Sequence, residues 1–169
     1  GKIVLGIPFY GRCWKAGEEY GGYGISAYHI DKLVKKYSGT VIYDENLKSA
    51  KAVFTVKPTD EISVIGSRTF DAGTYTIWFD NYDAVRYKLS LVNKYGLKGT
   101  GSWSLGQEPD GIWEYYSLWL NGFPFVDIGD SWAAEEIIAV AEKNIMMGVS
   151  GTRFNPKEAM TRAEAAVVI

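Results

Sequence analysis

The side chains best suited to chemistry in this sequence are aromatic and cationic, and they lie near the ends of two predicted strands. Tyr10 and Arg12 follow an apolar run that begins at Lys2, and Trp103 lies in a glycine-rich stretch, 98–105. A flat ring can pack against the C–H face of a sugar, while a guanidinium can donate to sugar hydroxyls or orient an acidic group. The rings can instead pack a hydrophobic core, and Arg12 can pair with a loop carboxylate, so both interpretations stay open.

Other reactive side chains have simpler explanations. Glu108 precedes a predicted helix, where a carboxylate is favoured by the helix dipole. Asp44 and Glu45 follow a short predicted strand and indicate a solvated turn. His29 has no evident catalytic partner, and Cys13 is expected to be a buried thiol rather than a nucleophile. Trp78 and Phe79 are expected to pack in the core.

Composition excludes several classes of protein. The 169 residues carry 18 Lys and Arg against 20 Asp and Glu, a net charge of −2, so a general affinity for nucleic acid is not expected. A single cysteine cannot form an internal disulfide, and one His with one Cys argues against a His/Cys zinc site. No apolar run approaches the length of a membrane span. The hydrophobic content of 47% predicts a globular fold of one domain, or one domain plus part of another.

The first half of the chain predicts one buried strand followed by a small α+β unit. The apolar run ending at Gly6-Ile7-Pro8 is typical of a strand in a parallel sheet. Because such a strand needs neighbours on both sides, the chain is expected to be a piece of a longer protein. The next block predicts a helix at 26–37 and an antiparallel sheet. The expected strands of that sheet are 40–43, 51–56, 62–65 and 74–79.

The second half alternates helix and strand, which is the rhythm of a parallel α/β layer. The expected elements are helices at 82–95, 112–120, 132–144 and 161–169, and a strand at 98–105. Thr161 and Glu164 have the spacing of a capping box at the start of the last helix. The strands at the two ends of residues 1–122 are therefore expected to share one sheet, with the α+β unit inserted between them.

Two stretches resemble the chitinase-like barrels of glycoside hydrolase family 18. Gly6-Ile7-Pro8-Phe9-Tyr10-Gly11-Arg12 resembles the seventh barrel strand of that family, and Gly101-Ser102-Trp103-Ser104-Leu105-Gly106 resembles the eighth. The segment between them resembles the family's α+β insertion domain, closing with Ile77-Trp78-Phe79-Asp80. The resemblance implies an α/β fold, namely the C-terminal fragment of a (β/α)8 TIM barrel. Its last two strand–helix units would be 1–14 and 81–122, with the insertion domain at 15–80.

Residues 123–169 resemble part of a helical S-layer homology repeat. The matching pieces are Phe125-Val126-Asp127, Trp132-Ala133, 145–148, Phe154-Asn155-Pro156 and Thr161-Arg162-Ala163-Glu164. The resemblance implies a protein secreted by a bacterium and bound to secondary cell-wall polysaccharide at the cell surface. Arg162 and Trp132 are then candidates to contact that polymer, because acidic groups suit a guanidinium fork. In the alternative interpretation Arg162 ties helix ends together and Trp132 packs a core.

The family 18 resemblance implies hydrolysis of β-1,4 bonds beside an N-acetylamino sugar, in chitin-like or peptidoglycan chains, by a substrate-assisted retaining mechanism. The resemblance requires no metal or organic cofactor. The family's acid is the glutamate that ends an Asp-x-x-Asp-x-Asp-x-Glu motif, and this sequence does not contain that motif. The chain alone is therefore expected to be inactive. What remains is a sugar-binding wall of Trp103, Tyr10 and Arg12, with Trp103 as the floor of the site beside the cleaved bond.

Two rival functions stay open. The parent protein can be a glycan-binding barrel without catalysis, or a surface-layer structural protein whose insertion contacts other proteins. A glutamate at the end of the fourth barrel strand would favour the enzyme. The apolar side chains of Ile3, Val4 and Leu5 would lie on an uncovered face of the barrel remnant, which predicts self-association or a rearranged remnant.

Overall fold

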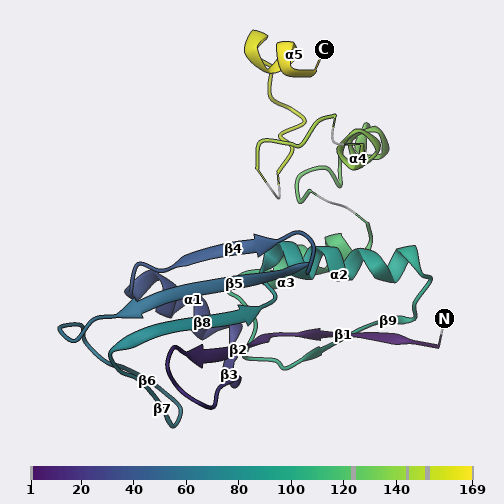
Figure 1. Ribbon diagram of the computed structural model, residues 1–169. Coiled ribbons are helices and arrows are strands. Elements are labelled where there is room, and N and C mark those ends of the chain that lie inside the picture. The colour runs from purple at the N-terminus through teal and green to yellow at the C-terminus, as the bar shows by residue number, and fades with distance from the viewer. Residues whose placement is uncertain (1, 123–124, 144, 151–152, 169) are drawn as a thin grey trace. The chain divides into compact units, whose positions relative to one another are not determined.

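A computed structural model describes residues 2–122, 125–143, 145–150 and 153–168 (Figure 1). The chain forms two compact units, Gly1–Ile112 and Trp113–Ile169. The first unit holds all the strands of the described residues, arranged in one sheet of five strands and two sheets of two. The second unit is helical.

A parallel pair of strands brings together the two ends of the first unit. β1 (Val4–Pro8) pairs in parallel with β9 (Gly99–Trp103), so that Val4 lies opposite Gly99 and Pro8 lies opposite Trp103. This is the pairing that the alternation of helix and strand predicted. Helix α2 (Tyr82–Lys94) contacts both strands, and its N-terminus is capped by Asn81, whose Oδ1 accepts from the Ala84 N–H at 3.1 Å.

Between these two strands the chain builds an antiparallel sheet in the order β3-β2-β8-β5-β4. Its strands are β2 (Tyr10–Lys15), β3 (Tyr23–Ser26), β4 (Thr40–Asp44), β5 (Ser49–Val56) and β8 (Gly73–Phe79). A separate hairpin of β6 (Ser63–Ile65) and β7 (Arg68–Phe70) lies in the connection between β5 and β8.

The core of the first unit lies on one face of the five-stranded sheet. Alternation along the strands buries Phe54 and Ile77, and helix α1 (Ala27–Lys36) covers them with Ile30 and Leu33. The Phe54 ring stacks between other aromatic rings, with its centroid 5.3 Å from that of Tyr75. The opposite face of this sheet carries the alternate residues and is more exposed.

The structure contains strands that the sequence did not predict. The opening strand has the pattern of a buried strand, but Ile3 is 66% exposed and Val4 51% exposed, as expected for a barrel remnant. The reason is that β9 is the only strand beside β1 in the described part of the chain. β3 forms where no strand was predicted, because its glycine-rich sequence has no strand pattern and it is held by pairing with β2. β7 was not predicted either.

The second unit packs around a small apolar centre. Its helices are α3 (Ile112–Leu120), which begins at the boundary of the units, α4 (Ala134–Glu142) and α5 (Arg162–Val168). Phe125, Ile128 and Ile137 are buried together, and Phe154 packs beside Phe125 with ring centroids 5.3 Å apart. Among the described residues, no helix is long and apolar enough to cross a membrane.

Two polar contacts organise the loops of this unit. The Asp127 carboxylate accepts from the backbone N–H groups of Phe154 at 3.0 Å and Asn155 at 2.8 Å, which holds together segments far apart in sequence. The predicted capping box of α5 is confirmed, because the Thr161 N–H donates to Glu164 at 2.7 Å and the Glu164 N–H donates to the Thr161 hydroxyl at 3.2 Å.

Candidate functional site

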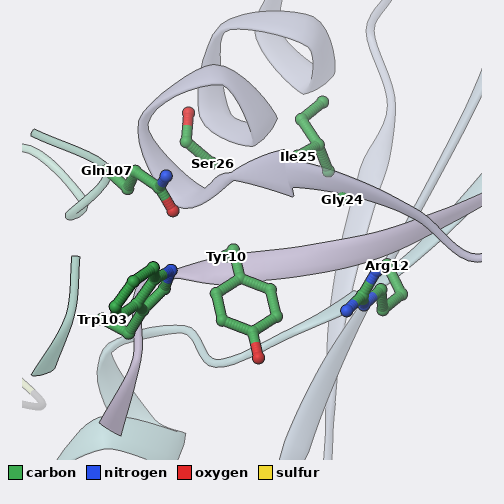
Figure 2. A pocket seen from close by; sticks show the side chains of 7 residues that line it. All are labelled: Tyr10, Arg12, Gly24, Ile25, Ser26, Trp103 and Gln107. Atoms are coloured by element: carbon green, nitrogen blue, oxygen red, sulfur yellow. The ribbon is translucent and has the colours of Figure 1, made fainter.

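A cavity of about 460 Å³ opens where β2, β3 and the end of β9 meet. The three residues predicted to bind sugar all lie in its wall. Figure 2 shows Trp103 beside Tyr10. Gln107 and Ser26 lie across from these two rings, and Arg12 lies further along β2. The lining residues are Tyr10, Arg12, Gly24, Ile25, Ser26, Trp103 and Gln107.

The backbone of Phe9 brings the two sheets to this cavity. β1 ends at Pro8 and β2 begins at Tyr10, so Phe9 is the single residue between the two sheets. The Phe9 N–H then donates to the Trp103 carbonyl at 2.7 Å, and the Phe9 carbonyl accepts from the Ala27 N–H at 2.9 Å. The next residue, Tyr10, starts β2 and therefore lies beside Trp103.

This geometry corrects one prediction from the sequence. Tyr10 and Arg12 were expected at the end of the first strand, but the structure places both on β2, a separate strand of the antiparallel sheet. Tyr10 lies opposite Ser26 and Arg12 lies opposite Gly24. Since residues two apart on a strand share a face, both side chains project toward the cavity. Gly24 leaves room there, because a Cβ added to it would meet only the Arg12 Nη1, at 3.9 Å.

Trp103 is presented to solvent rather than packed in a core. It is 72% exposed at the last position of β9, and the peptide bond to Ser104 is cis. The loop that follows is held in place by Gln107, whose N–H donates to the Ser104 carbonyl at 3.1 Å and whose carbonyl accepts from the Tyr28 N–H at 3.2 Å. The ring is therefore available to a ligand on a positioned strand end.

Arg12 provides the cationic group of the cavity. Its guanidinium donates to the Gly22 carbonyl at 3.2 Å and lies 5.4 Å from the centre of the Tyr10 ring. A loop carboxylate was the alternative partner for this residue, and among the described residues none pairs with it. Arg12 therefore keeps N–H groups that can donate to a ligand.

The other reactive side chains make structural contacts or are buried, although the contact of Glu108 with Gly106 lies in the loop before the helix and not at the helix start predicted for it. The Glu108 carboxylate accepts from the Gly106 N–H at 2.6 Å, and Asp44 Oδ1 accepts from the N–H of Asn46 at 2.9 Å within a turn. Cys13 is 2% exposed, and burial raises the pKa of its thiol to about 11, which suits a packed side chain and not a nucleophile. In the part of the chain that the structure describes, no group of His, Cys, Asp and Glu could hold a metal ion.

Sequence reasoning missed three residues near the cavity. Ser26 and Gln107 line it, and their positions follow from the β2–β3 register and from the loop after β9. Trp78 was expected in the core, and this is wrong, because it lies on the open face of β8 directly opposite Arg12. The alternation of buried Ile77 and Phe79 on either side was the signal that could have placed it.

The candidate residues of the second unit are on its surface. Trp132 is 95% exposed, so the interpretation of this ring as core is wrong. The reason is that α4 begins at Ala134, two residues later than predicted, and the helix face that packs the core starts after Trp132. Arg162 is exposed at the first position of α5, where the cap is made by its neighbours Thr161 and Glu164.

Two protein families match the sequence. Residues 1–108 match glycosyl hydrolases family 18, and residues 124–166 match the S-layer homology domain. A class V chitinase from Lotus japonicus is 30% identical over 109 residues, which is 64% of this chain and 26% of that protein. The chain thus spans about a quarter of the length of this relative.

Solved structures agree with the family match. A chitinase from Chromobacterium violaceum is similar with a TM-score of 0.54 and 30% sequence identity, over 70% of this chain and 32% of that one. The spore cortex-lytic enzyme SleL from Bacillus cereus is similar with a TM-score of 0.55 and 18% identity, over 68% of this chain and 24% of that one. The second likeness shows a shared fold alone.

Proposed function

We propose, because this chain belongs to glycosyl hydrolase family 18, that its first unit is the sugar-binding wall of a cell-wall glycosidase. In this proposal β1 and β9 are the last two strands of a (β/α)8 TIM barrel, residues 1–14 and 81–122 belong to that barrel, and 15–80 form its insertion domain. The parallel pairing of β1 with β9 and the antiparallel sheet between them support this assignment. In such barrels the site forms at the C-terminal ends of the strands, where Trp103 lies.

The observation that carries the proposal is the exposed Trp103 ring beside Tyr10 and Arg12 in one open cavity. An indole at a strand end can stack against the C–H face of an N-acetylglucosamine ring. Arg12, Ser26 and Gln107 can exchange hydrogen bonds with its hydroxyl and acetamido groups. The substrate class proposed is therefore a β-1,4-linked glycan that contains N-acetylglucosamine.

The chemistry of the whole protein would be substrate-assisted and retaining, with the acetamido oxygen of the sugar as nucleophile. That reaction needs a carboxylic acid to protonate the leaving oxygen. The sequence has no Asp-x-x-Asp-x-Asp-x-Glu motif, and no carboxylate is among the residues that line the described cavity. The residues of this chain would therefore bind and orient the sugar without transferring the proton.

The second unit would hold the protein at its site of action. S-layer homology domains indicate association with a bacterial cell surface or cell wall, and residues 124–166 match that family. The exposed Arg162 and Trp132 are proposed to contact secondary wall polysaccharide, the first by donating to acidic groups and the second by ring stacking. A secreted protein is implied by this location.

Binding and cleavage of a neutral oligosaccharide test the proposal. We expect calorimetry to show that the chain binds an N-acetylglucosamine tetramer and that product analysis shows no hydrolysis. Trp103→Ala should weaken binding about thirtyfold, because stacking on half of an exposed indole removes roughly 80 Å² of apolar surface from water.

Tyr95→Ala is the matched control, since Tyr95 is an aromatic residue that is 65% exposed outside the cavity. It should bind like the wild type. A tetramer that does not bind, or that binds equally well to the Trp103→Ala variant, would contradict the proposed sugar wall.

Self-association is proposed for the same unit. Ile3 and Val4 are adjacent large apolar side chains with exposed fractions of 66% and 51%. Exposed apolar patches often mark a surface that another protein covers. Light scattering after size-exclusion chromatography should give a mass above 18.8 kDa that rises with concentration. A monomer mass at low and high concentration would count against it.

A further inference from the structure

The open face of the five-stranded sheet carries a row of side chains that the proposed function leaves unexplained. Arg12 on β2 lies directly opposite Trp78 on β8, and Trp78 lies directly opposite Lys51 on β5. Opposite residues of neighbouring strands project to the same side of a sheet. A guanidinium, an indole and an ammonium therefore form one line across three adjacent strands. Figure 1 shows these strands, β2, β8 and β5, side by side.

This row lies on the solvent side of the sheet. The residues that alternate with it, such as Ala52 and Ile77, are fully buried on the face that α1 covers. Trp78 and Lys51 are half-buried and Arg12 is exposed. The Lys51 Nζ lies 5.8 Å from the centre of the Trp78 ring. The sheet thus offers an aromatic platform with a cation on each side.

The positive charge of the row is not neutralised within the described residues. Arg12 donates to a backbone carbonyl, that of Gly22, and Lys51 contacts the Trp78 ring, while no carboxylate pairs with either cation. Exposed cations usually gain little from a single surface carboxylate. Two of them flanking an aromatic ring are a better match for a ligand that carries negative charge and an apolar face.

The carboxylates at the nearby end of the sheet have other partners. Glu45 pairs with Lys48 at 2.7 Å, and Asp80 is buried and pairs with Lys88. Asp44 accepts from backbone N–H groups of the turn that follows it. These three acids therefore already have partners other than the cations of the row.

The spacing of the two cations also fits a polymer. Arg12 and Lys51 are two strands apart, which separates their backbones by about 10 Å. This is comparable to the length of one disaccharide unit of a β-1,4-linked glycan. A glycan in which every second sugar carries a carboxylate would present its acidic groups at that repeat.

We infer that the row of Arg12, Trp78 and Lys51 binds a glycan whose alternate N-acetylamino sugars carry free carboxylates, as N-acetylmuramic acid does where no peptide is attached to it, in preference to neutral chitin. Arg12 also lines the cavity that contains Trp103, so the row extends the proposed sugar site across the sheet. The inference rests on the proposed function, because it names the substrate class of the same site.

The test compares two soluble probes on the complete chain by calorimetry. One is the neutral N-acetylglucosamine tetramer, and the other is a tetrasaccharide that alternates N-acetylglucosamine with N-acetylmuramic acid. We expect the acidic probe to bind about tenfold more tightly at low ionic strength, and less so as added salt screens the charges. Lys51→Gln should reduce acidic-probe affinity about threefold to tenfold and leave neutral-probe affinity unchanged.

Lys57→Gln is the matched control, because it removes the same charge from an exposed position just beyond β5 and outside the row. It should keep the full preference for the acidic probe. Trp78→Ala should weaken the binding of the acidic probe, and circular dichroism of each variant checks that the sheet is intact.

Equal affinities for the two probes, or a Lys51→Gln variant that keeps the whole preference, would overturn the inference. That failure is distinct from failure of the proposed function. The proposed sugar wall stands if the neutral tetramer binds and Trp103→Ala weakens its binding, whatever the acidic probe does.

Discussion

Gly11 lies between the two cavity residues of β2, and replacing it with alanine should damage both the sheet and the site. Gly11 faces the core, where an added Cβ would lie 2.8 Å from the Phe79 Cβ, 2.8 Å from the Trp78 carbonyl oxygen and 2.9 Å from the Ile30 Cδ1. The side-chain methyl of Ile30 can move, but a carbonyl in the ladder cannot. β2 must therefore separate from β8 to accommodate the methyl group.

Overpacking of this kind costs about 2 kcal/mol. For a unit of this size it lowers the Tm by roughly 10 °C. Cys13 provides a local assay, because it is the only cysteine, lies two residues away on the same face and is 2% exposed. Its labelling by a thiol reagent requires the sheet to open, so Gly11→Ala should speed labelling about thirtyfold.

The matched control is Gly24→Ala on the neighbouring strand. An added Cβ there meets only one atom, the Arg12 Nη1 at 3.9 Å, so stability should be unchanged or raised by roughly 0.5 kcal/mol. Displacement of Tyr10 and Arg12 should also weaken the binding of the N-acetylglucosamine tetramer by the Gly11→Ala variant. Equal Cys13 labelling rates in the two glycine variants would refute the reasoning, because the predicted contact with the Trp78 carbonyl would then carry no cost.

Two further predictions concern the buried thiol of Cys13 and the partly buried carboxylate of Asp127. Burial raises the pKa of Cys13 from 9.0 to about 11, so the native state holds this proton more tightly than the unfolded chain does. The free energy of unfolding measured in urea should thus keep its full value below pH 9 and fall by about 1 to 2 kcal/mol between pH 9 and 11. Cys13→Ala should remove this loss. Asp127→Ala deletes the acceptor of two backbone N–H groups and should destabilise the second unit by about 2 to 4 kcal/mol in hydrogen exchange, whereas Asp130→Ala, at an exposed position, should not.

The helices of the first unit could be predicted from the sequence because their signals are local. The apolar spacing of Ile30 and Leu33 and the cap at Asn81 specify α1 and α2 to within a residue or two. β3 was missed because Tyr23–Ser26 becomes a strand through its pairing with β2, which is set by contacts distant in sequence. The same limit applies to β1, whose exposure depends on which strands surround it.

The main residues of the candidate site could be predicted from the sequence, but the strand pairing and the loop that bring them together could not. Tyr10, Arg12 and Trp103 follow from a resemblance of short motifs, whereas the surrounding positions of Ser26 and Gln107 follow from strand register and a loop anchored to Tyr28. No local pattern contains that information. The misplacement of Trp78 has a different cause, because period-two alternation between Ile77 and Phe79 assigns it to the open face.

Folding and recognition use different side chains at this site, which is what makes the binding experiments interpretable. Phe9 is fully buried, and its backbone hydrogen bonds join Trp103 to β2 without exposing its own ring. Trp103 and Arg12 project outward from that framework, so their replacement removes little buried surface. A loss of sugar affinity in Trp103→Ala therefore reports on the ligand contact, whereas the same loss in Gly11→Ala reports on the framework, and the Cys13 labelling rate tells the two apart.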